Sequence, residues 1–396
     1  MPYAANVRLF VLCQALTMSV PAFVIFAGGI VGRELAPDPA YATLPVALFM
    51  FGSAGSILPL VLAMQRFGRK PVFLLASTIS CLGGALAMVA LERGQFALYS
   101  VALVLMGIGL AAGQQYRFAA MESVAVDQIA SAASRVLLGG LVAAFLGPEL
   151  VSSGKHLLPV PFLGSFALLL AVMVAATIAL CWYREPPRPA AASAATAARP
   201  LGRILGQPAV LAAILAGAAS FTVMSLVMTA TPLHMHVVNE HSLDATKWVL
   251  QSHIAAMFAP ALLVPWLVRH IAVSGLLVCG LVAMTAVLFT VFAHFSFANY
   301  WLALVLLGLG WNFLFIGGTT LLAEQYRPAE AFRVQAVNDV TLFGLQALAA
   351  LGAGWLLAVA GWQTLLLCAA PFLLLAAAGL ANWKLRAGPA VTEPLP

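Results

Sequence analysis

The sequence predicts an all-α membrane protein with twelve transmembrane helices in two six-helix bundles and both termini in the cytoplasm. Three observations support this fold class. Hydrophobic residues make up 63% of the 396 residues and charged residues only 8%, whereas about a quarter of a soluble domain is charged. Mean hydropathy is +1.02, and long apolar runs recur along the chain. Lys and Arg are distributed unequally between the loops, which indicates the orientation.

The apolar runs are each long enough to cross the hydrocarbon core of a bilayer as one helix. No cleavable signal peptide is expected, because the first run is too long and no small-residue cleavage site follows it. The twelve expected spans are residues 9–32, 42–64, 71–91, 96–118, 133–152, 161–183, 209–233, 248–268, 272–293, 300–322, 337–359 and 363–383.

The basic residues set the expected orientation, because Lys and Arg are retained on the cytoplasmic side of a membrane. With both termini inside, fifteen of the nineteen Lys and Arg fall in cytoplasmic segments and four fall in outer loops. The net charge of +6 is therefore explained by topology, and no nucleic-acid partner follows from it. We expect a multi-pass protein of a bacterial inner membrane, with the lipid bilayer as a partner.

Residues 184–206 predict a cytoplasmic linker between two halves, residues 1–183 and 207–396. The stretch REPPRPAAASAATAARPLGR, which opens this segment, is rich in Ala and Pro and has no apolar periodicity, as is typical of flexible linkers. We therefore expect an N-terminal bundle and a C-terminal bundle of six helices each.

The two halves contain similar sequences at corresponding helices. YSVALVLMGIGL at residues 99–110 aligns with YWLALVLLGLGW at residues 300–311, and QYR follows each stretch. This similarity indicates a parallel duplication. Transporters built from such repeats bind their cargo near the bilayer midplane, between the halves, and expose it alternately to each side.

The loop after the second span resembles the signature of the major facilitator superfamily. It reads Gln65-Arg66-Phe67-Gly68-Arg69-Lys70, with Gln65 where that signature has Asp and Val61 where it has Gly. The resemblance implies the twelve-helix facilitator fold, while the charge latch attributed to the Asp is in doubt. Gly139, Gly140, Gly147 and Pro148 also resemble part of a motif of proton-linked exporters, although small residues at a helix contact explain them equally.

Soft metal ligands gather in the stretch from Phe221 to Met257. Met224 and Met228 are spaced i,i+4 in the seventh span, as are His253 and Met257 in the eighth, so each pair lies on one helix face. Thioether and imidazole together favour Cu(I) over hard cations. The alternative is that Met fills gaps in an apolar core. Met18 and Met50 could complete the site from the first half, or could simply pack.

Three residues between these spans suggest a capture site for metal arriving from outside. His234, Met235 and His236 follow Pro232 at the expected outer mouth. They can equally belong to a solvated surface. None of the thirteen carboxylates is expected at mid-depth, with Glu149 and Asp339 nearest to entering the membrane. This argues against a hard-cation transporter and against a proton-driven exporter, which use buried acids.

The paired motifs resemble those of the CcoA-type copper importers within the superfamily. Three sequence segments, TATPLHMH, QYRFAA and QAVND, are also similar to that branch. The part of the resemblance that is specific to copper depends on Met224, Met228, His253 and Met257. The resemblance implies uptake of copper across the inner membrane for cytochrome oxidase assembly, with copper chaperones or assembly factors as possible partners. A sister branch that lacks the paired motifs is linked to riboflavin uptake.

We therefore expect a copper importer that works by alternating access, with no enzymatic activity and no resident cofactor. The first alternative is an importer of riboflavin or a similar organic solute, for which Phe221, Phe258, Trp311 and Phe313 would form the wall. The second alternative is a proton-coupled exporter of organic compounds.

Overall fold

The computed structural model describes residues 4–124, 132, 135–136, 138–186, 199–262, 271–290, 295–327 and 330–387. These residues are helical or lie in turns, and no strand occurs among them. Most of the predicted linker, residues 187–198, lies outside the described ranges, as do parts of the fifth, eighth and ninth predicted spans.

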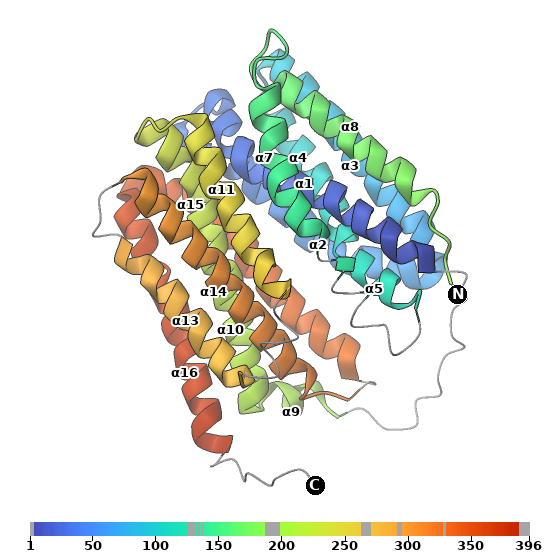
Figure 1. The fold of residues 1–396 in the computed structure, drawn as a ribbon, viewed down its shortest axis with the longest axis vertical. Coiled ribbons are helices and arrows are strands. Elements are labelled where there is room, and N and C mark those ends of the chain that lie inside the picture. Colours follow the sequence, from blue (N-terminus) through green and yellow to red (C-terminus); the bar gives the residue numbers. More distant parts are fainter. Residues whose placement is uncertain are drawn as a thin grey trace.

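The first group of helices, which we call the first bundle, runs from α1 to α8 (Figure 1). The described residues of this group also form a short 3₁₀ turn, η1 (Pro39–Tyr41), between α1 and α2. The bounds are α1 Ala4–Leu35, α2 Leu44–Phe67, α3 Arg69–Arg93, α4 Phe96–Gly113, α5 Tyr116–Met121, α7 Gly139–Gly154 and α8 Leu163–Leu180.

The second bundle runs from α9 to α16 (Figure 1). Its helix α10 continues into a π-helical turn, η3 (Leu233–Val238), and α11 continues into a 3₁₀ turn, η4 (Ala259–Leu262). The bounds are α9 Leu201–Leu205, α10 Pro208–Pro232, α11 Leu243–Phe258, α13 Val273–Phe289, α14 Phe297–Ala323, α15 Ala331–Leu367 and α16 Ala370–Ala387.

The predicted twelve-helix membrane fold is confirmed. Eight stretches of the described residues are long and apolar enough to cross a membrane. The last of them, Arg333–Arg386, holds two crossings, because the backbone leaves the helical conformation at Gly361, which has a φ of 77°. The shorter helices α7, α11 and α13 supply the remaining three.

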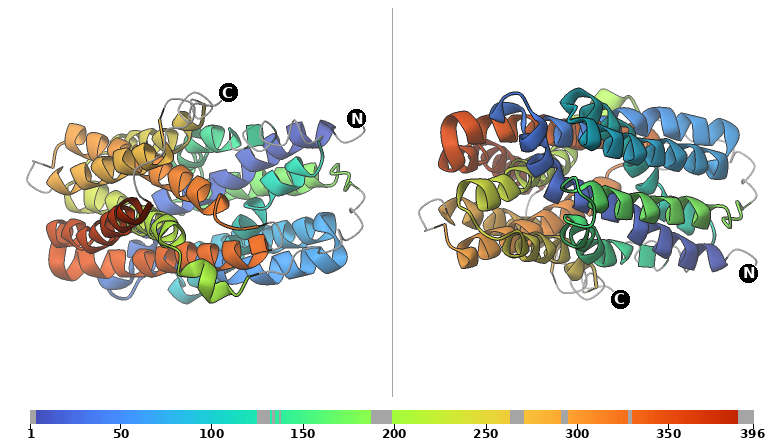
Figure 2. Two further views of the ribbon diagram at one scale, coloured as in Figure 1. Left: turned by 90° about the horizontal axis from the view of Figure 1, so that it is seen from below. Right: turned by 90° about the horizontal axis from the view of Figure 1, so that it is seen from above.

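The two bundles lie side by side, and both chain ends lie at one end of the molecule (Figures 1 and 2). This end is the cytoplasmic one, in agreement with the distribution of Lys and Arg. The helix pairs α7 with α11 and α2 with α15 pack across the boundary between the bundles.

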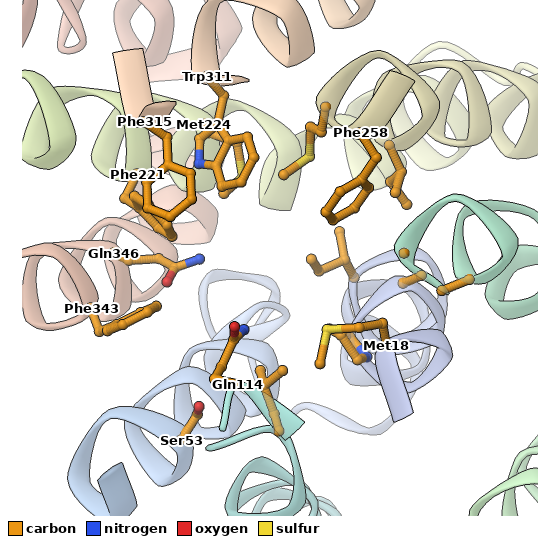
Figure 3. Close-up of a pocket in the computed structure, with 18 of the residues that line it drawn as sticks. Met18, Ser53, Gln114, Phe221, Met224, Phe258, Trp311, Phe315, Phe343 and Gln346 are labelled. Carbon is orange, nitrogen blue, oxygen red and sulfur yellow. The ribbon is translucent and has the colours of Figure 1, made fainter. Parts of the chain in front are cut away.

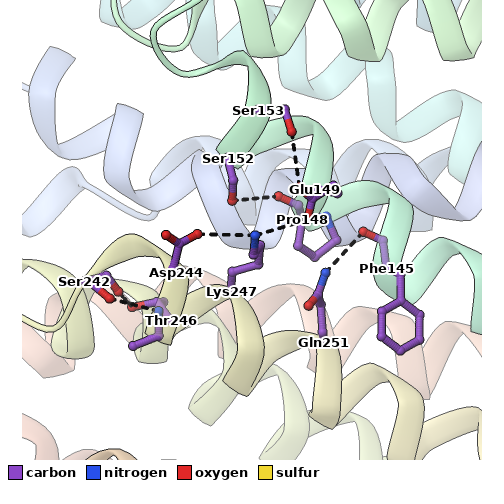
Figure 4. A network of polar contacts seen from close by, with 11 residues as sticks. Phe145, Pro148, Glu149, Ser152, Ser153, Ser242, Asp244, Thr246, Lys247 and Gln251 are labelled. Atoms are coloured by element: carbon purple, nitrogen blue, oxygen red, sulfur yellow. Dashed lines mark hydrogen bonds and ion pairs between the residues drawn. The ribbon is translucent and has the colours of Figure 1, made fainter.

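Polar contacts join the bundles at the end that faces away from the cytoplasm (Figure 4). Lys247 of α11 lies 3.1 Å from Glu149 of α7 and 3.2 Å from Asp244 of its own helix. One turn further along α11, the Gln251 side-chain amide donates a hydrogen bond to the carbonyl oxygen of Phe145. These contacts hold α7 and α11 together at the outer side of the molecule.

The loop after α2 is held by acids of its own bundle. Gly68 has a φ of 98°, a conformation that favours glycine. Glu185 accepts hydrogen bonds from the backbone N–H groups of Arg69 and Lys70, and the Arg69 guanidinium contacts both carboxylate oxygens of Glu122. In the second bundle, hydrogen bonds from Arg199 hold the pKa of Glu330 well below its usual range. Both cytoplasmic loop regions therefore have ordered ion pairs.

Candidate transport cavity

A central cavity of about 200 Å³ lies between the bundles. Helices α1, α2, α4, α5 and α7 contribute walls from the first bundle, and α10, α11, α14 and α15 contribute walls from the second (Figure 3). Backbone carbonyl and N–H groups of these helices are paired within the helices, so the chemistry of the cavity comes from side chains. A second cavity of about 550 Å³ lies between α2, α5 and α15 and is lined by the cytoplasmic loop residues Arg69 and Glu185.

Aromatic rings cover the second-bundle side of the central cavity (Figure 3). The Phe221 ring of α10 lies 5.3 to 5.4 Å from the rings of Trp311, Phe315 and Phe343, in edge-to-face geometry. The rings of Trp311 and Phe315 are stacked at 5.0 Å. Such clusters form binding walls for flat apolar or aromatic groups. Phe258 of α11 continues the wall toward α7.

Three of the four aromatic residues predicted for an organic cargo line this cavity, and one does not. Phe221, Phe258 and Trp311 are among the lining residues, whereas Phe313 is not and Phe315 takes its place. Residues two positions apart on an α-helix point in directions that differ by about 200°. Because Trp311 faces the cavity, Phe315, one turn further along α14, shares its face and Phe313 points elsewhere.

The predicted thioether ligands face the same cavity. Met224 and Met228 of α10 and Met257 of α11 line it and are at most 8% exposed. Met18 and Met50 line it from the first bundle. None of these side chains is turned toward lipid. A lipid-facing orientation would have argued against a metal site.

His253, the fourth predicted ligand, is fully buried but is not among the cavity-lining residues. Its Nδ1 atom lies 2.7 Å from the carbonyl oxygen of Leu304, and its Nε2 atom has no hydrogen-bond partner in the described structure. A histidine that ligates a metal commonly donates its other ring N–H to a carbonyl in this way. His253 therefore lies behind the wall with one ring nitrogen unused.

The polar lining of the cavity consists mainly of amides. Gln14 and Gln114 come from the first bundle, and Asn312 and Gln346 come from the second. Four buried polar atoms of lining residues lack a partner in the described structure: Gln14 Oε1, Arg117 Nε, Trp311 Nε1 and Asn312 Oδ1. Buried polar groups are normally paired, so these atoms indicate groups that a bound molecule can satisfy.

One acid reaches the cavity, and it is one of the two that the sequence places nearest to entering the membrane. Asp339 lines both cavities, and Arg117 of α5 lines the central one close enough to interact with it electrostatically. Asp339 lies two turns inside α15, because this helix begins at Ala331, six residues before the predicted span. The cavity therefore has one acidic and one basic side chain in its lining.

The outer histidines are held by protein contacts in this conformation. His234 is buried, its Nδ1 atom lies 2.6 Å from the Tyr300 hydroxyl, and Asn239 contacts its Nε2 atom at 3.3 Å. Its ring stacks on Trp362 at 4.5 Å with an interplanar angle of 2°. The Nδ1 atom of His236 contacts the carbonyl oxygen of His241, and Met235 is fully buried. A capture site at these residues stays a prediction, and it needs a different conformation.

Several lining residues were not identified in the sequence. Phe315, Phe343, Gln14 and Gln346 occur in largely apolar runs, so no periodicity marks their orientation, and Gln114 precedes the recurring QYR. The recurring QYR sequence is the one feature that indicated the position of a lining residue. It places Arg117 and Arg327 at corresponding helix ends, and Arg117 faces the cavity.

The comparison with known proteins points to transporters. The family model of the Major Facilitator Superfamily matches residues 9–345. The riboflavin transporter RfnT of Brucella anthropi is 36% identical over 362 residues, which cover 91% of each chain. The uncharacterized transporter YddS of Bacillus subtilis is 33% identical over 80% of this chain and 77% of its own.

Solved transporters have the same fold. A D-xylose–proton symporter superposes with a TM-score of 0.73 at 14% identity, covering 96% of this chain and 98% of its own. The nucleoside transporter NupG gives a TM-score of 0.72 at 13% identity, covering 96% and 100%. At these identities the likeness concerns the fold. The family match, the relatives and the fold agree, and the chain belongs to the major facilitator superfamily of membrane transporters.

Proposed function

We propose that this transporter imports riboflavin or a closely similar flat heteroaromatic solute by alternating access. The single observation that carries the proposal is the aromatic wall of Phe221, Trp311, Phe315 and Phe343, which borders buried polar atoms that have no partner. A flavin ring offers a flat face for such a wall. Its edge offers both donors and acceptors for the unpaired atoms.

The similarity to a riboflavin transporter over nine-tenths of both chains supports the same cargo. The amides of the first bundle suit the rest of such a molecule, because the hydroxyl groups of a polyol chain can both donate to and accept from an amide. Gln114 lies across the cavity from the aromatic wall (Figure 3), and Gln14 also lines the cavity from the first bundle.

Uptake of labelled riboflavin tests this proposal. Cells that lack their own flavin importer, and that express this chain, are expected to accumulate the label with saturable kinetics. Unlabelled riboflavin should compete, and an equally hydrophobic compound without an aromatic ring should not. Equal accumulation in cells with and without the chain would contradict the proposal.

Copper is the second candidate cargo, and one observation favours it. Met224, Met228 and Met257 face one cavity, and the unused Nε2 atom of His253 lies on the helix that carries Met257. Thioether and imidazole form a ligand set for Cu(I). On this hypothesis copper would serve cytochrome oxidase assembly, and the cargo would bind without any resident cofactor.

Copper content separates the two candidates. Cells expressing the chain at limiting copper would contain more of the metal than control cells only if copper is the cargo. Met228→Leu or His253→Leu would then abolish the difference. A normal copper content with saturable riboflavin uptake would reject the copper hypothesis.

A further inference from the structure

Asn312 is fixed in one orientation by the helix beside it. Its Nδ2 atom donates a hydrogen bond of 2.6 Å to the carbonyl oxygen of Met257. That carbonyl lies where α11 changes into the 3₁₀ turn η4, which contains Pro260, so regular α-helical pairing ends there. Reversing the amide would bring two acceptors together. The Oδ1 atom of Asn312 can therefore act only as an acceptor.

This acceptor and a neighbouring donor have no partners in the described structure. Asn312 Oδ1 and Trp311 Nε1 are both buried and unpaired. The two residues line the central cavity and are 4% and 7% exposed, respectively. An unpaired buried polar group costs free energy that a matching ligand group recovers. The protein therefore keeps one acceptor and one donor, of fixed type, at adjacent positions of α14.

We propose that Asn312 and Trp311 select cargo that carries a lactam or imide edge. The Asn312 Oδ1 atom accepts a hydrogen bond from a ring N–H, and the Trp311 Nε1–H group donates to a ring carbonyl oxygen or ring nitrogen. This inference rests on the proposed function, because it takes the cargo to be a flat heteroaromatic ring.

The aromatic wall determines which part of the cargo reaches these atoms. Trp311 itself stacks on Phe315 and packs against Phe221 and Phe258. A ring bound to this wall brings its own rigid edge next to Trp311 and Asn312. A flexible polyol chain is then left for the amides of the first bundle. Riboflavin has an imide N–H between two carbonyl groups at one ring edge, which is the pattern that the two side chains match.

The test compares riboflavin with riboflavin methylated at that imide nitrogen, in uptake by the unaltered protein. Methylation removes the N–H and is expected to lower the apparent affinity by about tenfold or more, since it leaves a buried acceptor unpaired. The control analogue lacks one methyl group at the opposite, hydrocarbon edge of the ring. Its apparent affinity should be within about fourfold of that of riboflavin, because burial of one methyl group contributes about 0.8 kcal/mol.

Variants then show whether Asn312 is the partner of that N–H. Asn312→Leu should lower riboflavin affinity by about tenfold and leave the affinity for the methylated analogue unchanged, as a double-mutant cycle requires. A variant that only misfolds would lower both equally. Trp311→Phe keeps an aromatic ring but removes the indole N–H. It should lower the apparent affinity for riboflavin and for the methylated analogue by the same factor, because both compounds retain the ring carbonyl groups.

Two outcomes would overturn the inference, and they can be told apart. If the protein takes up riboflavin and its methylated analogue equally, the role of Asn312 is refuted while the proposed function stands. If the unaltered protein takes up no flavin, the proposed function and this inference both fall.

Discussion

Two groups of side chains in one cavity carry different chemistry, and we call them the aromatic side and the thioether side. The aromatic side, formed by Phe221, Trp311, Phe315 and Phe343, holds rings in mutual contact. The thioether side, formed by Met224, Met228 and Met257, has the residues that a sequence motif predicts for copper. The difference teaches that a ligand-like spacing on two helices does not decide the cargo, because thioethers also pack well against flat aromatic molecules.

The largest effect is expected from the aromatic side. Phe315→Leu removes a stacked ring from the cavity and should lower riboflavin uptake by about tenfold, since aromatic pairing adds to area burial. The measurement is the initial rate of labelled riboflavin uptake, corrected for the amount of protein in the membrane. Phe313→Leu is the matched control, because it lies on the same helix but does not line the cavity. Equal losses in both variants would contradict the assignment of the aromatic side.

An intermediate effect on the transport rate is expected at the outer contact between the bundles. This effect does not depend on whether the cargo is riboflavin or copper. Lys247→Gln removes the ion pairs with Glu149 and Asp244 and should change the transport rate by roughly twofold to threefold, because the pair is partly exposed and therefore weak. The apparent affinity should stay the same, since Lys247 does not line the cavity.

Glu149→Gln sharpens this prediction. The variant that carries both Lys247→Gln and Glu149→Gln should be no slower than Lys247→Gln alone, because the contact of Lys247 with Glu149 is already lost in that single variant. A change in apparent affinity rather than in rate would place Lys247 in cargo binding and reject its role as an outer contact.

The smallest effect is expected from the thioether side. Met228→Leu conserves volume and should leave riboflavin uptake within about twofold, as Met-to-Leu exchanges in packed sites usually do. Met284→Leu in α13, fully buried and outside the cavity, is the control for packing. A large and specific loss in Met228→Leu would mean that the sulfur itself contacts the cargo.

The fold could be predicted from sequence because it depends on quantities that sum over many residues. Apolar length gave the spans, which the structure confirms, and the position of Lys and Arg gave the orientation. Of the four predicted metal ligands, Met224, Met228 and Met257 line the central cavity, whereas His253 is buried outside its lining, and their role in metal binding stays a prediction.

The details of the site could not be predicted, since lipid-facing and core-facing residues are both apolar. The rotation of α14 about its axis determines that Phe315 rather than Phe313 faces the cavity. The sequence does not indicate this rotation, because the helix is apolar on all faces. The contacts of His234 with Tyr300 and Trp362 join residues 66 or more positions apart. The depth of Asp339 follows from the start of α15, and helix boundaries are the least predictable feature of a sequence.

The most direct test of the central claim is transport by the purified protein in lipid vesicles, with labelled riboflavin and with Cu(I) in parallel. The account predicts saturable riboflavin entry that excess copper does not inhibit, with no copper entry above that of empty vesicles. Copper entry without riboflavin entry would contradict the account and would move the cargo from the aromatic side of the cavity to the thioether side.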